Sequence, residues 1–164
     1  LPISEINVID SDNPKDISQN IDSYQSAGAL TLHVPVLYGN YIFVNFGRTS
    51  KPVLIDTGAT TSIVGTDLLR SISQHLMSKI NKGNVSQAKL VDGSQTNILG
   101  TIVLNLFLED RKFNLEFQVM PSMEYWAIIG MDFLQKHNCI IDYSKNEVII
   151  PYFQTIDGDR KSVV

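Results

Sequence analysis

Hydrophobic and polar residues alternate along much of the chain between Leu30 and Tyr152, in short runs separated by turn-forming residues. Such alternation is typical of β-strands that bury one face. It predicts strands at residues 30–37, 40–46, 52–55, 101–109, 113–121, 127–130, 139–143 and 146–152. In 40–46 the residues on both faces are apolar, so we expect other parts of the protein to cover this strand on both sides.

Three stretches depart from this simple pattern. Residues 88–100 predict two strands around a turn at Asp92-Gly93, because this dipeptide favours hairpins. Residues 66–80 carry an apolar stripe at helical spacing, with Thr66 as a candidate N-cap. A second, shorter helix is predicted at 132–138, where the carboxylate of Asp132 suits the free N–H groups of a helix start. Many strands and little helix predict an all-β domain.

The composition is that of one folded domain with polar ends. Of 164 residues, 43% are hydrophobic and 18% are charged, which suffices for a packed core. Residues 1–29 are rich in Ser, Asn, Asp and Gln without a sustained period, and we interpret them as a flexible linker. The domain is then expected at 30–151, followed by a polar tail at 152–164. The chain lacks an initiator Met, which is typical of a piece processed from a longer chain or of an expressed fragment.

Charge and residue usage exclude several classes of function. The net charge is −4 and no Lys/Arg cluster occurs, so nucleic acid is not an expected partner. No apolar run approaches the ~18 residues of a membrane span, and no membrane association is expected. The single Cys139 and three scattered histidines predict no disulfide and no metal site. One cysteine also favours a reducing compartment.

The stretch VLIDTGATTS (53–62) places a carboxylate, Asp56, at the end of an apolar strand, where an unpaired charge is costly. Two carboxylates that share a proton can act as acid and base together, whereas one alone is a weak base. The sequence supplies the motif once. Asp132 and Asp142 also follow apolar stretches, but neither precedes Ser/Thr-Gly. A two-fold dimer, which brings Asp56 against its own mate, is the economical source of a second acid.

The motif DTGA at 56–59, preceded by apolar residues and followed by TTSIV, resembles the active-site motif of retropepsin-type aspartic proteases. These are half-size homodimeric proteases of retroviruses and LTR retrotransposons. The stretch 88–100 lies where the family has its flap hairpin, and AIIGMDFL (127–134) resembles its apolar-apolar-Gly segment and short helix. The resemblance spans about residues 30–150 and implies a closed β-barrel or sandwich with a flap hairpin and one or two short helices, assembled as a homodimer.

The resemblance also implies roles for individual residues. Asp56 would be catalytic, and each protomer would give one. The loop around it would be formed by Thr57, Gly58 and Ala59. The flap that binds substrate would comprise Val91, Asp92, Gly93, Ser94, Gln95 and Thr96. Structural residues near the site would be Ile128, Ile129 and Gly130. No cofactor or metal is needed. The terminal strands at 139–143 and 146–152 are candidates for interleaving between protomers.

These observations predict an endopeptidase that cuts an extended peptide or a viral or retroelement polyprotein of the Gag-Pol type. The expected location is the cytoplasm or virus-like particles. Two alternatives remain: a domesticated retropepsin fold that serves as a dimerisation or peptide-binding module, and a cellular retropepsin-like protease. For single residues simpler roles also remain. Asp56 could be a turn residue, Trp126 a core or subsite-wall aromatic, Cys139 a small buried hydrophobe, and His137 a complement to a helix dipole.

Overall fold

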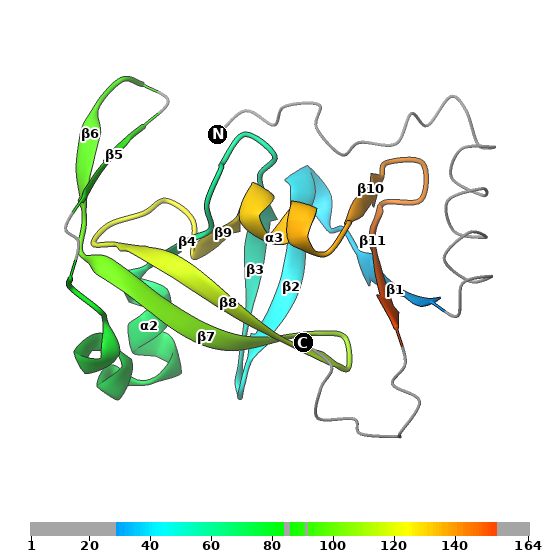
Figure 1. Ribbon diagram of the computed structural model, residues 1–164, viewed down its shortest axis with the longest axis horizontal. Coiled ribbons are helices and arrows are strands. Elements are labelled where there is room, and N and C mark those ends of the chain that lie inside the picture. The colour runs from blue at the N-terminus through cyan, green and yellow to red at the C-terminus, as the bar shows by residue number, and fades with distance from the viewer. Residues whose placement is uncertain (1–28, 84–85, 91, 154–164) are drawn as a thin grey trace.

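A closed barrel of six strands forms the centre of the protein, in the order β2-β3-β9-β4-β8-β7 (Figure 1). The computed structural model describes residues 29–83, 86–90 and 92–153, so most of the predicted linker and tail lie outside the described residues. The barrel strands are β2 (Tyr41–Phe46), β3 (Thr49–Ile55), β4 (Ile63–Gly65), β7 (Gly100–Leu108), β8 (Arg111–Met120) and β9 (Ala127–Ile129). The predicted all-β class is thereby confirmed. A 3-10 turn, Tyr38–Asn40, leads into β2.

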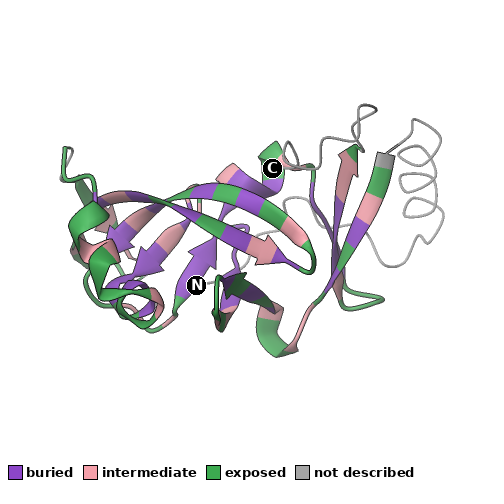
Figure 2. Ribbon diagram, turned by 90° about the horizontal axis from the view of Figure 1, so that it is seen from below, coloured by how far each residue is buried: buried purple, intermediate pink, exposed green. Residues whose placement is uncertain are grey.

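The β7–β8 hairpin follows the predicted alternation closely. Its nine paired positions run from Gly100↔Val119 to Leu108↔Arg111, with the turn at Glu109-Asp110. Buried and exposed residues alternate along both strands, as the colour bands of Figure 2 show. Because successive side chains of a strand point to opposite faces, this pattern brings one apolar row per strand into the barrel core. These inward residues are Ile102, Leu104, Leu106, Leu108, Phe113, Leu115, Phe117 and Val119.

The outer face of β2 differs from the prediction. Ile42, Val44 and Phe46 point into the core as expected. On the other face, however, Phe43 is 55% exposed, so this strand is covered on one side only. Strand β2 pairs with β3 and β7 in an antiparallel arrangement, in which a sheet can leave one face in water. The expectation of cover on both sides was therefore wrong.

A second sheet joins the two ends of the described chain. It has the order β1-β11-β10, with β1 (Ala29–Pro35), β11 (Glu147–Phe153) and β10 (Ile140–Asp142). The predicted hairpin between 139–143 and 146–152 is confirmed, because β10 and β11 are antiparallel neighbours. Strand β1 pairs along the other edge of β11. On the edge that it shares with β10, β11 is paired only over residues 147–149, so residues 150–153 have no strand partner on that side within the described chain. Interleaving of the terminal strands between protomers therefore stays a prediction.

The helix predicted at 66–80 is divided in two. An α-helix, α2 (Thr66–Ile72), ends at the extended residue Ser73, and a 3-10 segment (Gln74–Lys79) follows. The Ser73 side chain accepts a hydrogen bond from the N–H of His75 at 3.2 Å, which starts the second segment. The N-cap is Gly65, not Thr66. Thr66 is the first helical residue, buried, and its hydroxyl donates to the carbonyl oxygen of Pro121 at 2.8 Å.

Two further predicted elements are confirmed. A hairpin of β5 (Ser86–Lys89) and β6 (Gln95–Ile98) projects from the barrel where β7 begins, at the end opposite the β7–β8 turn (Figure 1). A short helix, α3 (Met131–Lys136), follows β9 and carries Asp132 in its first turn. Every helix of the described residues is too short or too polar to cross a membrane.

Candidate active site

The loop that carries Asp56 begins where β3 ends. The backbone N–H of Asp56 donates to the carbonyl oxygen of Ile129 at 3.0 Å, which joins the loop to β9. The N–H of Gly58 donates to Asp56 Oδ1 at 2.8 Å. Asp56 is 0% exposed, and its Oδ2 has no hydrogen-bond partner in the described part of the chain. The site therefore contains a buried carboxylate with one oxygen held by the loop and the other unpaired.

The chain crosses behind this loop at Gly130, so that all three predicted structural residues, Ile128 to Gly130, lie beside the site. Strand β9 runs parallel to β3, with Leu54 opposite Ile128. The N–H of Met131 donates to the carbonyl oxygen of Ala59 at 2.8 Å. A Cβ atom on Gly130 would lie 2.7 Å from the carbonyl oxygens of both Ala59 and Thr61. Only glycine allows the two segments to approach so closely.

Ser62, which the sequence analysis did not single out, ties the far end of the loop to α3. Its hydroxyl donates to Asp132 Oδ1 at 2.7 Å and accepts from the N–H of Gly130 at 3.0 Å. The second oxygen of Asp132 accepts from the N–H of Ser62 at 3.0 Å. Asp132 Oδ1 also accepts from the N–H of Phe133 at 2.8 Å. Both carboxylate oxygens of Asp132 are thus engaged in holding the loop, so this residue does not supply the second acid.

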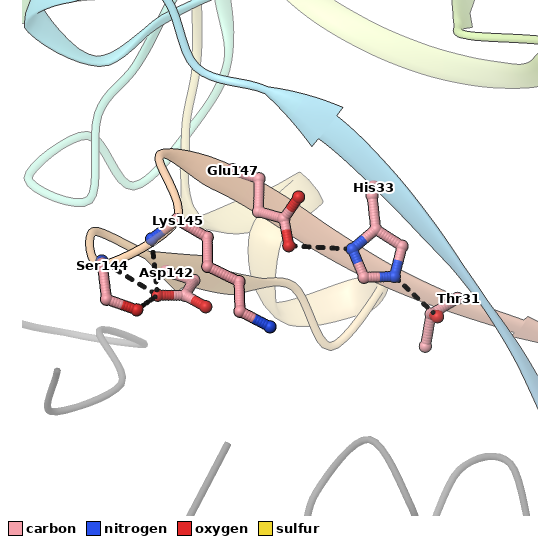
Figure 3. A network of polar contacts seen from close by, with 6 residues as sticks. All are labelled: Thr31, His33, Asp142, Ser144, Lys145 and Glu147. Atoms are coloured by element: carbon pink, nitrogen blue, oxygen red, sulfur yellow. Dashed lines mark hydrogen bonds and ion pairs between the residues drawn. The ribbon is translucent and has the colours of Figure 1, made fainter. Parts of the chain in front are cut away.

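Asp142 is likewise engaged in local hydrogen bonds, in the turn between β10 and β11. Its Oδ1 accepts from the N–H and the hydroxyl of Ser144, at 2.9 and 2.6 Å, and so closes the turn between β10 and β11 (Figure 3). Across the same sheet, His33 Nδ1 lies 2.9 Å from Glu147 Oε1. Asp142 Oδ2 is buried without a partner in the described residues. No hydrogen bond joins Asp142 to the described part of the Asp56 loop, so the candidate acids within the chain are used elsewhere.

A cavity of about 280 Å³ lies between the β5–β6 hairpin and the segment that connects β8 to β9. It is lined by Ile63, Leu90, Asp92, Met120, Ser122, Met123, Glu124, Tyr125 and Ile128. Ile128 pairs with Leu54 on one side and with Ile63 on the other, so the cavity floor continues the sheet that carries Asp56. Asp56 follows the last residue of β3 directly and stands two residues beyond Leu54. The cavity floor therefore lies on strands next to the one that leads into the Asp56 loop, although none of residues 56–59 lines the cavity.

The predicted flap residues are only partly brought to this cavity. Asp92 lines it, while Gly93 has φ +85° and completes the turn by donating its N–H to the carbonyl oxygen of Leu90 at 2.9 Å. Ser94 donates its N–H to Asp92 Oδ1 at 2.8 Å. Gln95 and Thr96 belong to β6 and do not line the cavity. Val91 lies outside the described residues.

Sequence reasoning missed the cavity residues of the segment 120–125. Two methionines and a tyrosine precede the AIIG stretch there, and large apolar residues in a loop are a usable signal of a binding surface. Trp126 is 36% exposed and does not belong to the core. The Lys51 ammonium lies over the Trp126 ring, 4.0 Å from the ring centroid. Among the described residues no group of three His, Cys, Asp or Glu is placed to hold a metal ion.

Curated relatives share part of their length with this chain. Protein DDI1 homolog 1 of Caenorhabditis elegans is 29% identical over 134 residues, which cover 75% of this chain and 34% of that protein. The retrovirus-related Pol polyprotein from transposon 412 of Drosophila melanogaster is 32% identical over 94 residues, which cover 57% of this chain and 7% of the polyprotein. The chain thus spans about a third of one relative and a small part of the other.

Solved structures show the same fold. The retroviral protease-like domain of Ddi1 from Leishmania major matches with a TM-score of 0.58 at 23% identity, covering 71% of this chain and 89% of that one. A retropepsin-like aspartic protease from Rickettsia conorii matches with a TM-score of 0.51 at 15% identity, covering 76% and 92%. The model of the PEG10/RTL1 protease domain matches residues 52–153, which include the Asp56 loop, the hairpin and α3. The chain belongs to this family of retropepsin-type protease domains.

Proposed function

We propose that the protein is an aspartic endopeptidase that works as a homodimer, with one Asp56 from each protomer. The observation that carries this proposal is the Asp56 carboxylate itself, which is 0% exposed with Oδ2 unpaired. Burying an unpartnered carboxylate oxygen is costly. Asp142 Oδ2 is also buried and unpaired in the described residues, but Asp142 closes the β10–β11 turn with Ser144 and does not stand in the Asp-Thr-Gly motif, so Asp56 is the candidate for a catalytic use. A second Asp56 across a two-fold axis would let the pair share one proton, which removes one of the two charges and supplies the missing partner.

The contacts of the other candidate acids in the chain support a second Asp56, from another copy, as the partner of the first. Asp132 is bonded to Ser62, and Asp142 closes its own turn. The terminal sheet leaves β1 and β10 as its edge strands, and exposed edges are the usual place for another chain to add a strand. We therefore expect the dimer to form along one of these edges.

In this mechanism a water molecule lies between the two Asp56 carboxylates. The ionised carboxylate takes a proton from the water as its oxygen attacks the scissile carbonyl carbon, and the protonated one donates to the carbonyl oxygen. Thr57 is proposed to bond to its mate and stiffen the loop. Gly58 and Ala59 offer backbone groups to the acids and the substrate. Hydrogen bonds from Gly58 to Asp56 and from Met131 to Ala59 fix the loop within each protomer.

The substrate is proposed to be an extended polypeptide, bound between the β5–β6 hairpin and the cavity floor. Such a peptide can add to exposed strands while alternate side chains enter pockets. The likeness to a retrotransposon Pol polyprotein supports processing of a polyprotein of that type. The likeness to a DDI1 homolog supports a cellular protein as substrate instead. Comparing the rate at which the protein cleaves a polyprotein that contains this chain with the rate for unrelated cellular proteins distinguishes these two substrate classes.

The test pairs a peptide-cleavage assay with sedimentation. Asp56→Asn is expected to abolish cleavage of an apolar peptide library at about pH 5 and to leave the fold and the dimer intact. Asp110→Asn, in the exposed β7–β8 turn, serves as the matched control and should cleave like the unmodified protein. An inhibitor of the statin type, which mimics the tetrahedral intermediate, should block the activity. Cleavage that survives Asp56→Asn, or full turnover by a monomer, would overturn the proposal.

A further inference from the structure

The cavity between the β5–β6 hairpin and the β8–β9 connection combines an apolar floor with an adaptable wall. Ile63 and Ile128 form the floor and are paired across β4 and β9. Met120 and Met123 line the wall that leads out of β8. Methionine side chains are flexible and polarisable, so they fit alkyl chains of different shapes. This part of the cavity suits a long, unbranched hydrocarbon segment.

Two carboxylates stand over this apolar floor. Asp92 comes from the hairpin turn and Glu124 from the β8–β9 connection, so they belong to different walls. The Ser94 hydroxyl and N–H both donate to Asp92 and lower the pKa of this carboxyl below its ordinary value. Among the described residues, none that lines the cavity is Lys, Arg or His. No cationic side chain of the described part of the chain therefore lines the cavity to neutralise the two negative charges.

A row of tyrosines extends the same wall. The ring of Tyr125 lies 6.2 Å from that of Tyr41, and Tyr41 lies 6.0 Å from Tyr38. Burial raises the pKa of Tyr41, and electrostatic interactions with Tyr125, Glu124 and Tyr38 add to this effect. Glu124 thus lines the cavity and is near enough to Tyr41 to interact with it electrostatically. Aromatic faces attract cations, so this wall favours the same kind of guest as the two carboxylates.

We propose that this cavity selects a lysine or arginine side chain of the substrate, with its alkyl stem on the methionines and its cation beside Glu124 and Asp92. The inference rests on the proposed peptidase function and adds a substrate class to it. An apolar cavity alone would accept leucine or methionine equally well. The carboxylates favour a cationic end, since long basic side chains bury their stems and leave the charge in water. They also reject acidic residues by repulsion.

The test uses peptides that differ at one position near the scissile bond, with Lys, Arg, Met or Glu in that place. At one position kcat/KM for Lys or Arg is expected to exceed that for Met by about fivefold, the scale of a solvent-exposed ion pair. Glu should be the poorest substrate. Rising salt should weaken the preference, because these charges are near the surface. Equal or better cleavage with Met than with Lys and Arg at every position would overturn the inference.

Variants separate the charge from the shape of the cavity. Glu124→Gln should bring Lys and Met close to equal, and Glu124→Lys should favour Glu over Lys. Glu109→Gln, in the exposed turn between β7 and β8, removes the same charge elsewhere and should change no preference. A Lys preference that persists in the Glu124→Gln, Asp92→Asn double variant would contradict the assigned residues.

The failure of this inference can be told from the failure of the proposed function. If the protein cleaves peptides without preferring a basic residue, the peptidase proposal stands and this one falls. If it cleaves none, binding of the same labelled peptides is measured by fluorescence anisotropy. Tighter binding of the Lys peptide than of the Met peptide, lost in Glu124→Gln, would support the selective cavity without catalysis. Equal or absent binding would overturn it.

Discussion

Ser62 Oγ lies 2.7 Å from Asp132 Oδ1, in a hydrogen bond that joins residues 70 positions apart. The same hydroxyl accepts from the N–H of Gly130, and the other Asp132 oxygen accepts from the N–H of Ser62. One serine and one carboxylate therefore hold the end of the Asp56 loop against the start of α3. Ser62 is 0% exposed, whereas Asp132 is half-buried.

Removing either member of this pair is expected to destabilise the protein. Ser62→Ala leaves the N–H of Gly130 without its acceptor, and Asp132→Asn turns an amide donor toward the Ser62 N–H or hydroxyl. Each change should lower the free energy of unfolding by about 1–3 kcal/mol, the cost of a buried group left unsatisfied. Urea unfolding measures the difference. Ser50→Ala, at an exposed position of β3, is the control and should change stability little.

The double variant tests whether the two residues act together. Because they contact each other, the combined loss should be smaller than the sum of the single losses. Additive effects would show that Ser62 and Asp132 stabilise the loop independently and would contradict a shared hydrogen-bond network.

Gly130→Ala is expected to be more harmful than an ordinary glycine substitution. Its Cβ would lie 2.7 Å from two backbone carbonyl oxygens, and neither segment can move without disturbing the Asp56 loop. We expect a loss of about 3 kcal/mol, at the upper end of the costs of overpacking, together with loss of activity. Gly65→Ala is the matched control, because its Cβ would find nothing closer than 3.5 Å. Thermal unfolding of both variants makes the comparison, and equal melting temperatures would contradict it.

Strands with clean alternation were predictable from the sequence. In β8 each buried residue, from Phe113 to Val119, falls where the period of two places it. The hairpin around Asp92-Gly93 and the loop at Asp56 also follow from local residue types. These features depend on nearest neighbours along the chain, which is why a single sequence reveals them.

Features that depend on distant contacts were not predictable. Strand β4 has only three residues and is defined by its pairing with β8 and β9. The pairing of β1 with β11 joins the two ends of the described chain, and no local pattern specifies it. The apolar stripe of 66–80 continues across the break at Ser73, since Leu76 and Ile80 still pack on the core, so periodicity could not locate the break. The cavity likewise needs segments far apart in sequence.

The rate of cleavage should depend on pH with a bell-shaped profile centred on the acid side of neutrality. Two Asp56 carboxylates that share one proton work only in the singly protonated state, so both the gain and the loss of a proton stop the reaction. The measurement is kcat/KM against pH for a fixed peptide. A flat profile from about pH 4 to about pH 9 would exclude a shared-proton pair.

Cys139 is expected to be unreactive in the folded protein. Its side chain is 4% exposed, and burial raises the pKa of the thiol to about 12. Since the thiolate is the nucleophile, a thiol reagent at about pH 8 should find almost none in the native state. One equivalent should react after unfolding in urea. Rapid labelling of the native protein would show that β10 opens readily, because Cys139 directly precedes that strand.

His137 follows α3, where a positive charge could complement the helix dipole, but its surroundings have the opposite effect. Its ring packs against Phe133 and Phe113, with centroids 4.4 and 5.1 Å away. Burial, with a smaller contribution from Lys136, lowers the pKa of His137 below its ordinary value of 6.5. The unfolded chain therefore binds a proton more readily than the folded protein does in the range below 6.5.

Stability should consequently fall as the pH drops through 6.5, and the loss should level off below the folded pKa of His137. His137→Phe keeps an aromatic ring against Phe113 and Phe133 but cannot take up a proton, so its melting temperature should fall less on acidification. The measurement is the difference in melting temperature between variant and unmodified protein across this range. Replacing the exposed His75 by Phe is the control, and that variant should follow the unmodified protein. A difference that does not change with pH would mean that protonation of His137 contributes nothing to acid sensitivity.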